Sequence, residues 1–297
     1  MINSILKILA VFLVFTSTIK SYAQGQAFSF EYFQHLIFLK VKINTSKSLL
    51  FLFDTGANVS AIDTKIADSL SLLTLKKDYV EGSAGKIFVP YVEIQSVSTG
   101  GYTVNDLIFT KYDLSSSLAP PGQKVDGILG MDFLKHFVVV IDFRNRLMTL
   151  SKKVTDRLAT VVPFELENGI PRIKAKINNI VSTYFRYDSG SSLFDTKEVY
   201  LNTTTSIFKS LMNVDSSMKI VANLKAKGIG GSIDIPVYKI NSVLLDKIEL
   251  RNLYVIVQPE RGYFSRSDAV GFFGNNLLDK YRGVTIDFIN KEIFLNN

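Results

Sequence analysis

The sequence contains no cysteine, only two histidines and only seven prolines among its 297 residues. Without cysteine the chain can form neither a disulfide nor a thiolate metal site, and it cannot use a thiol nucleophile or carry a lipoprotein anchor. Its fold must therefore be stabilised by packing alone. Few prolines together with 47% hydrophobic residues indicate a globular chain without low-complexity segments.

The two histidines, His35 and His136, do not fit a catalytic or metal-binding pattern. His35 precedes a predicted strand and His136 follows a predicted short helix, and the sequence has neither an HExxH pair nor a Gly-x-Ser-x-Gly elbow. The glycine-rich segment 80–86 is not a phosphate loop, because two residues instead of four separate its glycines and Ile87 follows its lysine. We therefore expect no metal and no cofactor.

Long apolar runs are also scarce, and the one that matters lies near the N-terminus. Residues 5–15 are apolar apart from one lysine, and Ser21-Tyr22-Ala23 resembles an A-x-A cleavage site. This predicts a signal peptide over 1–23, cut before Gln24. A retained membrane anchor is the alternative, but the run is shorter than the ~20 residues of a spanning helix. We expect an exported protein, periplasmic or extracellular, without stable membrane insertion after cleavage.

The formal net charge of the sequence is +7. A positive excess can favour an anionic surface or a polyanion. The sequence has no dense basic cluster and no basic amphipathic helix, so the excess is interpreted as a solvated basic face. We expect no nucleic-acid partner.

What the sequence does contain is a motif that occurs twice, as FLFDTGA at 51–57 and FRYDSGS at 185–191. A single Asp-Thr-Gly would be uninformative, because Asp and Gly are common turn residues. The alignment of Asp54 with Asp188 also places Lys42-Ile43-Asn44 opposite Lys176-Ile177-Asn178 without a gap. Two copies in matching surroundings indicate a duplication.

A second repeated motif extends this duplication along the chain. GILGMDFL at 127–134 matches GFFGNNLL at 271–278, and IDF occurs in both halves shortly afterwards. A period near 140 residues is too long for a solenoid, whose repeats span about 20 to 50 residues, and it suits two whole lobes. The predicted domains are 24–155 and 156–297, each close to the usual size of about 100 to 150 residues.

Apolar alternation predicts that strands dominate both lobes. The first lobe should contain a hairpin over 35–54, one short helix over 60–73, and strands over 86–98 and 102–109. The motif at 127–134 should form a buried turn and a short helix, followed by a closing hairpin. The second lobe should repeat this order, with paired strands over 235–257 and a loop over 258–268. The predicted fold class is all-β with few short helices.

These motifs resemble the aspartic peptidases of the pepsin and retropepsin clan, and in particular the bacterial two-lobed retropepsin-like proteins. The resemblance rests on the paired Asp-Thr/Ser-Gly signatures and on two later motifs, Ile128-Leu129-Gly130 and Phe272-Phe273-Gly274. It covers nearly all of the mature chain. It implies two tandem acid-protease β-barrel lobes with the active site at their interface.

The resemblance also implies which residues form the site. Asp54 and Asp188 would be the catalytic pair, supported by Thr55, Gly56, Ser189 and Gly190. The two glycine-rich hairpins would close over the substrate as flaps, with Gly82 and Gly85 in one and Gly228, Gly230 and Gly231 in the other. No metal is implied.

Two adjacent carboxyl groups can hydrolyse a peptide without metal or histidine, because like charges in close proximity share one proton, as in aspartic proteases as a class. The ionised carboxylate would activate a water and the protonated carboxyl would stabilise the tetrahedral intermediate. The predicted function is an exported, monomeric aspartic endopeptidase acting on peptide or protein substrates. The alternative is a catalytically weak or inactive peptide-binding protein, favoured by Arg186 and Tyr187 at the places of Leu52 and Phe53.

Overall fold

The computed structural model of the chain describes residues 25–154, 160–192 and 198–296. The predicted signal peptide and its cleavage point lie outside the described residues, and so does the predicted domain boundary. No helix within the described ranges has the length and apolar character needed to cross a membrane.

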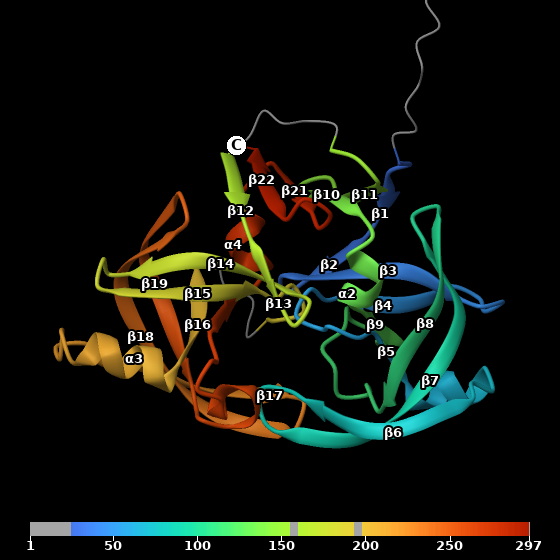
Figure 1. Cartoon of the computed structure of the whole chain (residues 1–297), viewed down its shortest axis with the longest axis horizontal. Helices are drawn as coiled ribbons and strands as arrows, with labels where there is room; N and C mark the ends of the chain where they lie inside the picture. Colours follow the sequence, from blue (N-terminus) through green and yellow to red (C-terminus); the bar gives the residue numbers. More distant parts are fainter. Residues whose placement is uncertain (1–24, 155–159, 193–197, 297) are drawn as a thin grey trace, which may run out of the picture.

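The protein is built from three β-sheets and a few short helices (Figure 1). Two eight-stranded sheets come from the two halves of the chain, which we call the first lobe (described residues up to 154) and the second lobe (from residue 160). A six-stranded sheet joins them. The predicted all-β, two-lobed fold is confirmed.

The sheet of the first lobe has the strand order β2-β3-β4-β9-β5-β8-β7-β6. Its strands are β2 Glu31–Phe33, β3 Leu36–Ile43, β4 Leu49–Phe53, β5 Ala61–Asp63, β6 Thr74–Glu81, β7 Lys86–Thr99, β8 Tyr102–Tyr112 and β9 Gly127–Leu129. Its helices are α1 Thr64–Ser69 and α2 Met131–Leu134.

The sheet of the second lobe repeats this order as β13-β14-β15-β20-β16-β19-β18-β17. Its strands are β13 Glu165–Glu167, β14 Ile170–Ile177, β15 Val181–Tyr187, β16 Tyr200–Thr204, β17 Ile220–Gly228, β18 Gly231–Leu245, β19 Ile248–Gln258 and β20 Gly271–Phe273. Its helices are α3 Thr205–Met212, the 3-10 helix η1 Gly262–Ser265, and α4 Asn275–Leu278. The matching order shows that the sequence repeat is a repeat of structure.

The closing hairpins of both lobes combine into the six-stranded sheet, in the order β1-β11-β10-β21-β22-β12. Its strands are β1 Phe28–Ser29, β10 Val138–Asp142, β11 Leu147–Ser151, β12 Thr160–Pro163, β21 Gly283–Asp287 and β22 Glu292–Asn296. The strands β10 and β21 pair antiparallel across the lobes, with Val139 opposite Ile286. The sequence predicted the hairpins but not this pairing between them.

The predicted helix over 60–73 is too long. Ala61 and Ile62 instead pair with β8 and β9 as strand β5, because their apolar side chains suit the buried sheet as well as a helix. The helix α1 begins only after Asp63, whose carboxylate accepts a hydrogen bond from the Lys65 N–H at 2.9 Å and caps the first turn. Ser71, at φ 53°, lies beyond its end.

The strand β6 and the helix α3 are among the elements that were not predicted, and so is η1, which lies within the predicted loop over 258–268. The strand β6 is largely exposed and polar, so its sequence lacks an apolar face; it is held by backbone pairing with β7. The helix α3 is capped by Thr204, whose hydroxyl accepts from the Ile207 N–H at 3.1 Å.

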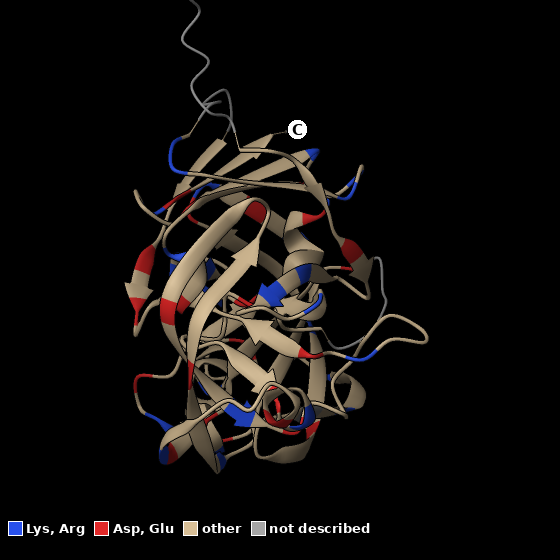
Figure 2. Ribbon diagram, turned by 90° about the vertical axis from the view of Figure 1, so that its right-hand side faces the viewer, with Lys and Arg blue, Asp and Glu red and all other residues tan. Residues whose placement is uncertain are grey.

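One continuous hydrophobic core runs through both lobes and the joining sheet, and includes Phe53, Val139, Tyr187 and Ile286. Basic and acidic positions are interspersed over the ribbon in a side view (Figure 2). The six-stranded sheet and the strands β6 and β17 lie at opposite ends of the molecule in Figure 1.

Candidate active site

Each repeated aspartate directly follows the last residue of a strand, β4 in the first lobe and β15 in the second. The strand β4 ends at Phe53 and runs parallel to β9, and the Asp54 N–H donates to the Leu129 carbonyl at 3.0 Å. In the second lobe the Asp188 N–H donates to the Phe273 carbonyl at 2.9 Å in the same way. The later glycine motif of each lobe thus fixes the point at which the chain leaves the sheet.

The hydroxyl residues after the aspartates bind the two loops to each other. The Thr55 N–H donates to Ser189 Oγ at 2.9 Å, and the Ser189 N–H donates to Thr55 Oγ1 at 3.0 Å. Each hydroxyl in turn donates across the interface, Thr55 to the Tyr187 carbonyl at 2.7 Å and Ser189 to the Phe53 carbonyl at 2.9 Å. Both side chains are fully buried. Four reciprocal hydrogen bonds therefore hold the lobes in register at this point.

The two glycines leave space for the carboxyl group of the opposite lobe. A Cβ atom on Gly56 would lie within 3.0 Å of the Asp188 carboxyl carbon, and one on Gly190 within 3.0 Å of the Asp54 carboxyl carbon. The Gly56 N–H also donates to Asp54 Oδ1 at 2.8 Å. Any side chain at either position would push the carboxyl groups apart.

The two carboxyl groups are partly buried and hydrogen-bonded to each other, which raises the pKa of both. Burial raises the pKa of Asp54, although hydrogen bonds from the Gly56 and Ala57 N–H groups oppose this. Burial raises the pKa of Asp188 well above its usual range, and the neighbouring Asp54 carboxylate raises it further. Because two adjacent carboxylates repel each other, the pair shares one proton.

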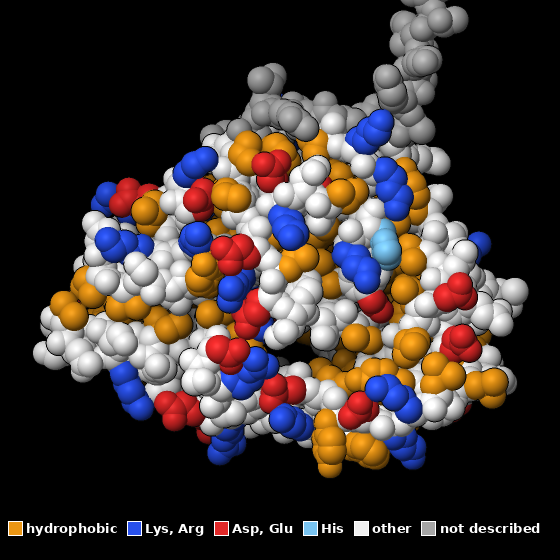
Figure 3. All heavy atoms as spheres, in the orientation of Figure 1, with side chains coloured by type: hydrophobic (Ala, Val, Ile, Leu, Met, Phe, Trp, Pro, Cys, Tyr) orange, Lys and Arg blue, Asp and Glu red, His pale blue; other side chains and the backbone are white. Residues whose placement is uncertain are grey.

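The glycine-rich segments form the tips of two hairpins, β6–β7 and β17–β18, and the tips meet. The Ala84 N–H donates to the Ile229 carbonyl at 3.1 Å, and a Cβ on Gly230 would collide with the backbone of Gly85. Gly230, at φ 100°, needs a conformation that side-chain-bearing residues rarely adopt. Figure 3 shows a hollow between the lobes above these strands.

The flap tip of the first lobe also contacts the second lobe through a residue that the sequence did not single out. The Tyr263 N–H, in η1, donates to the Gly82 carbonyl at 3.0 Å. The Arg186 guanidinium lies 3.9 Å from the centre of the Tyr263 ring and 3.0 Å from a Glu167 carboxylate oxygen. The charge of Arg186, which interrupts the apolar run before Asp188, is thus balanced.

A valine at Gly230 should impair turnover more than stability. The added side chain meets the backbone of Gly85 only when the flap tips are together, so it should hinder closure over a substrate, and we expect kcat/KM to fall at least about tenfold. The matched control is Gly169→Val, which also has positive φ but has nothing within 4 Å. Melting temperature and kcat/KM are measured for both. Equal losses in the two variants would show that Gly230 serves only the turn.

The structure places the predicted site residues in two groups. Asp54 and Asp188 meet at the lobe interface with Thr55, Gly56, Ser189 and Gly190, and the flap glycines lie at or next to the meeting hairpin tips. The described ranges contain no group of three or more His, Cys, Asp or Glu that could hold a metal ion.

Residues 39–133 match the family described as aspartyl protease, which confirms the resemblance to the retropepsin-like aspartic peptidases. The match includes Asp54, Thr55 and Gly56 and supports a peptidase hydrolase of the aspartic type. Comparison with curated proteins gives no match.

Proposed function

We propose that the protein is an endopeptidase in which Asp54 and Asp188 form the catalytic dyad. The observation that carries this proposal is the contact between the two carboxyl groups at the lobe interface, fixed by the reciprocal bonds of Thr55 and Ser189. The same loops explain why both lobes are needed, because each supplies one carboxyl group. The proposed lobes comprise residues 24–155 and 156–297.

In the proposed mechanism Asp54, whose Oδ1 accepts a hydrogen bond from the Gly56 N–H, is the base and Asp188 is the acid. The Asp54 carboxylate removes a proton from a water, which attacks the peptide carbonyl, while Asp188 donates its proton to the carbonyl oxygen. The C–N bond of the tetrahedral intermediate then breaks as Asp54 gives its proton to the leaving nitrogen, and one hydroxyl proton of the intermediate returns to Asp188 as the new carboxyl group forms. Water is the nucleophile, so no covalent enzyme intermediate forms. The supporting residues Thr55, Gly56, Ser189 and Gly190 keep both carboxyl groups fixed during these proton transfers.

Digestion of an unfolded protein substrate at acid and neutral pH tests this proposal against the peptide-binding alternative. New peptides with ends inside the substrate sequence are expected, whereas a binding protein would retain the substrate intact. Arg186 and Tyr187 favoured the alternative at the level of sequence. Because Arg186 is paired and Tyr187 is hydrogen-bonded within the fold, neither disturbs the loop of Asp188.

Specific activity should not depend on enzyme concentration. Both aspartates lie on one chain, so docking of the lobes is intramolecular, with an effective concentration of order millimolar even for a flexible linker. Activity is measured from nanomolar to micromolar enzyme alongside light scattering, and a monomer is expected. Loss of specific activity on dilution, together with dissociation of a dimer, would show that the dyad forms between chains.

We also propose that the protein is exported to the periplasm or the medium after removal of residues 1–23, without stable membrane insertion. This rests on the short apolar run and on the small residues that precede Gln24. N-terminal sequencing of the exported protein should begin at Gln24. A mature form that keeps residues 5–15 would favour the membrane anchor.

A further inference from the structure

The two lobes differ at a pair of buried positions beside the catalytic loops. The residue before the aspartate is Phe53 in the first lobe and Tyr187 in the second, and the residue after the later glycine is Met131 or Asn275. All four side chains are at most 2% exposed. The first lobe thus has an apolar pair where the second has a hydroxyl and an amide. The Tyr187 hydroxyl donates to Asn275 Oδ1 at 2.8 Å.

The amide of Asn275 makes contacts on both sides of the catalytic aspartate and with the other lobe. Its Oδ1 accepts from Tyr187, which precedes Asp188, and its Nδ2 donates to the carbonyl of Ser189, which follows it, at 3.2 Å. The same Nδ2 donates to the His35 carbonyl of the first lobe at 2.7 Å. A buried amide is costly unless it is hydrogen-bonded, and here both its oxygen and its nitrogen are used.

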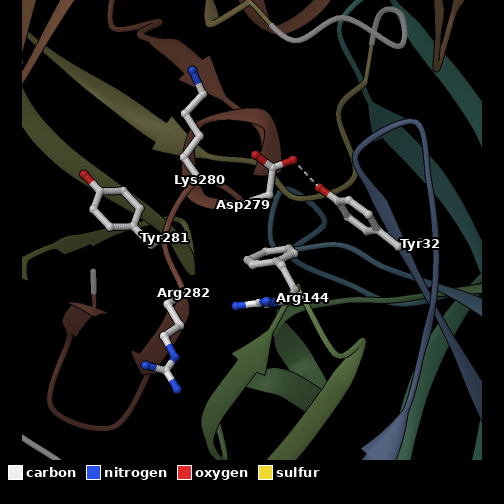
Figure 4. Close-up of a pocket in the computed structure, with 7 residues that line it drawn as sticks. Tyr32, Arg144, Asp279, Lys280, Tyr281 and Arg282 are labelled. Carbon is white, nitrogen blue, oxygen red and sulfur yellow. Dashed lines mark hydrogen bonds between the residues drawn. The ribbon is translucent and has the colours of Figure 1, made fainter.

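The turn that carries His35 makes a second contact with the end of α4, the short helix that begins at Asn275. His35 has φ 61°, which non-glycine residues adopt infrequently. Its Nδ1 lies 2.7 Å from Asp279 Oδ2, and the Tyr32 hydroxyl donates to that oxygen at 2.7 Å (Figure 4). Asp279 directly follows α4, whereas Asn275 begins it. Residues at both ends of α4 therefore contact the turn of the first lobe that carries His35.

Asp279 also lines a cavity of about 410 Å³. Neither catalytic aspartate lines it; its walls are Tyr32, Phe143, Arg144, Asp279, Lys280, Tyr281 and Arg282. The contacts of Asp279 and Asn275 therefore form a continuous connection from this outer cavity, through the turn of His35, to the loop of Asp188.

We propose that Asn275 is a positioning residue for Asp188. It binds Tyr187 and Ser189, which flank Asp188, and it links their loop to the first lobe through the carbonyl of His35. This inference rests on the proposed catalytic dyad. The bonds of Thr55 and Ser189 act equally on both loops, whereas the Asn275 contacts exist on one side only. The Asn275 contacts hold the residues on either side of Asp188, so their loss should change the position of the Asp188 carboxyl group relative to Asp54.

The test replaces the residues of the second lobe with those of the first, as Asn275→Met, Tyr187→Phe and the double variant. Asn275→Met should lower kcat at least about tenfold with KM nearly unchanged, because the geometry of the reacting groups is lost while the cleft remains. Loosening the loop also reduces the influence of Asp54 on Asp188. The high-pH limb of the pH-rate profile should therefore move to lower pH.

The double variant separates positioning from stability. It restores an apolar pair, so its melting temperature should recover relative to Asn275→Met, but its kcat should stay low because the bonds to Ser189 and His35 are still missing. The control is Asn202→Leu, which removes another buried amide of the second lobe, hydrogen-bonded to Gln258. This control should lose stability without a shift of the pH-rate profile.

Several outcomes overturn the inference. A folded Asn275→Met protein with wild-type kcat and pH profile does so, and so does a double variant that recovers activity together with stability. If Asn275→Met does not fold, Tyr187→Phe decides, since it removes only one hydroxyl and should still lower kcat a few-fold; an unchanged kcat contradicts the inference. A wild type without activity dependent on Asp54 would overturn the proposed function, and this inference with it.

Discussion

Asp54→Asn and Asp188→Asn are each expected to abolish peptidase activity while the protein stays folded. Each change removes one of two proton transfers that only the pair supplies, and loss of a general acid or base costs about 10²- to 10⁴-fold in rate. Cleavage of an unfolded protein is measured for both variants, with circular dichroism as the check on folding. Activity retained by either single variant would contradict the dyad.

The same variants should raise stability, and the sign follows from the pKa shifts. The pKa of Asp188 is raised in the folded protein, so its contribution to stability is fully present below its unfolded value of about 3.9 and is lost as pH rises through the folded value. Asp188→Asn should therefore raise the melting temperature at pH 7, and the gain should vanish below about pH 3.9. The control, Asp215→Asn, removes an exposed carboxyl whose pKa is lowered by hydrogen bonds from Ser217; it should not raise the melting temperature at pH 7.

Gly190→Ala is expected to abolish activity and to destabilise the protein. The added methyl group would lie within 3.0 Å of the Asp54 carboxyl carbon, and neither loop can move aside without breaking the bonds of Thr55 and Ser189. Overpacking of this kind typically costs about 1 to 3 kcal/mol. Activity and thermal unfolding are compared with those of the wild type.

Gly283→Ala is the matched control, because the nearest atom to its added methyl group is 3.7 Å away and its backbone is not in the left-handed region. It should keep both activity and stability. A Gly190→Ala protein as active as this control would mean that the carboxyl groups can separate without loss of function, and that the proposed geometry is wrong.

The sequence predicted the architecture of the two Asp-containing loops because their determinants are local. An aspartate, a hydroxyl residue and a glycine stand next to one another in each loop, and the duplication supplies the second copy. Thr55 and Ser189, which the resemblance implied as supporting residues, hydrogen-bond to each other across the lobes. The buried turn at 127–134 and the closing hairpins were also evident, since each depends on a short apolar segment.

The contacts that the sequence could not predict join segments far apart along the chain. Asn275 meets His35 and Tyr187 only after both lobes have folded, and a single asparagine after a glycine gives no sign of this. The departure of Tyr187 from the apolar pattern was visible as an irregularity. The reason for a tyrosine at position 187 is its hydrogen bond to Asn275, which lies 88 residues further along the chain. The pairing of β10 with β21 was hidden for the same reason.

The six-stranded sheet determines how such a protein can admit a substrate. The strands β10 and β21 are adjacent in one sheet. A rigid-body separation of the two lobes would therefore break backbone hydrogen bonds inside a continuous core. The glycine hairpins lie at the opposite end of the molecule and touch mainly at their tips (Figure 1). A long substrate chain would thus enter when the two glycine-rich hairpins move away from the rest of the molecule. The two Asp-containing loops, with their carboxyl groups, would keep their conformation throughout.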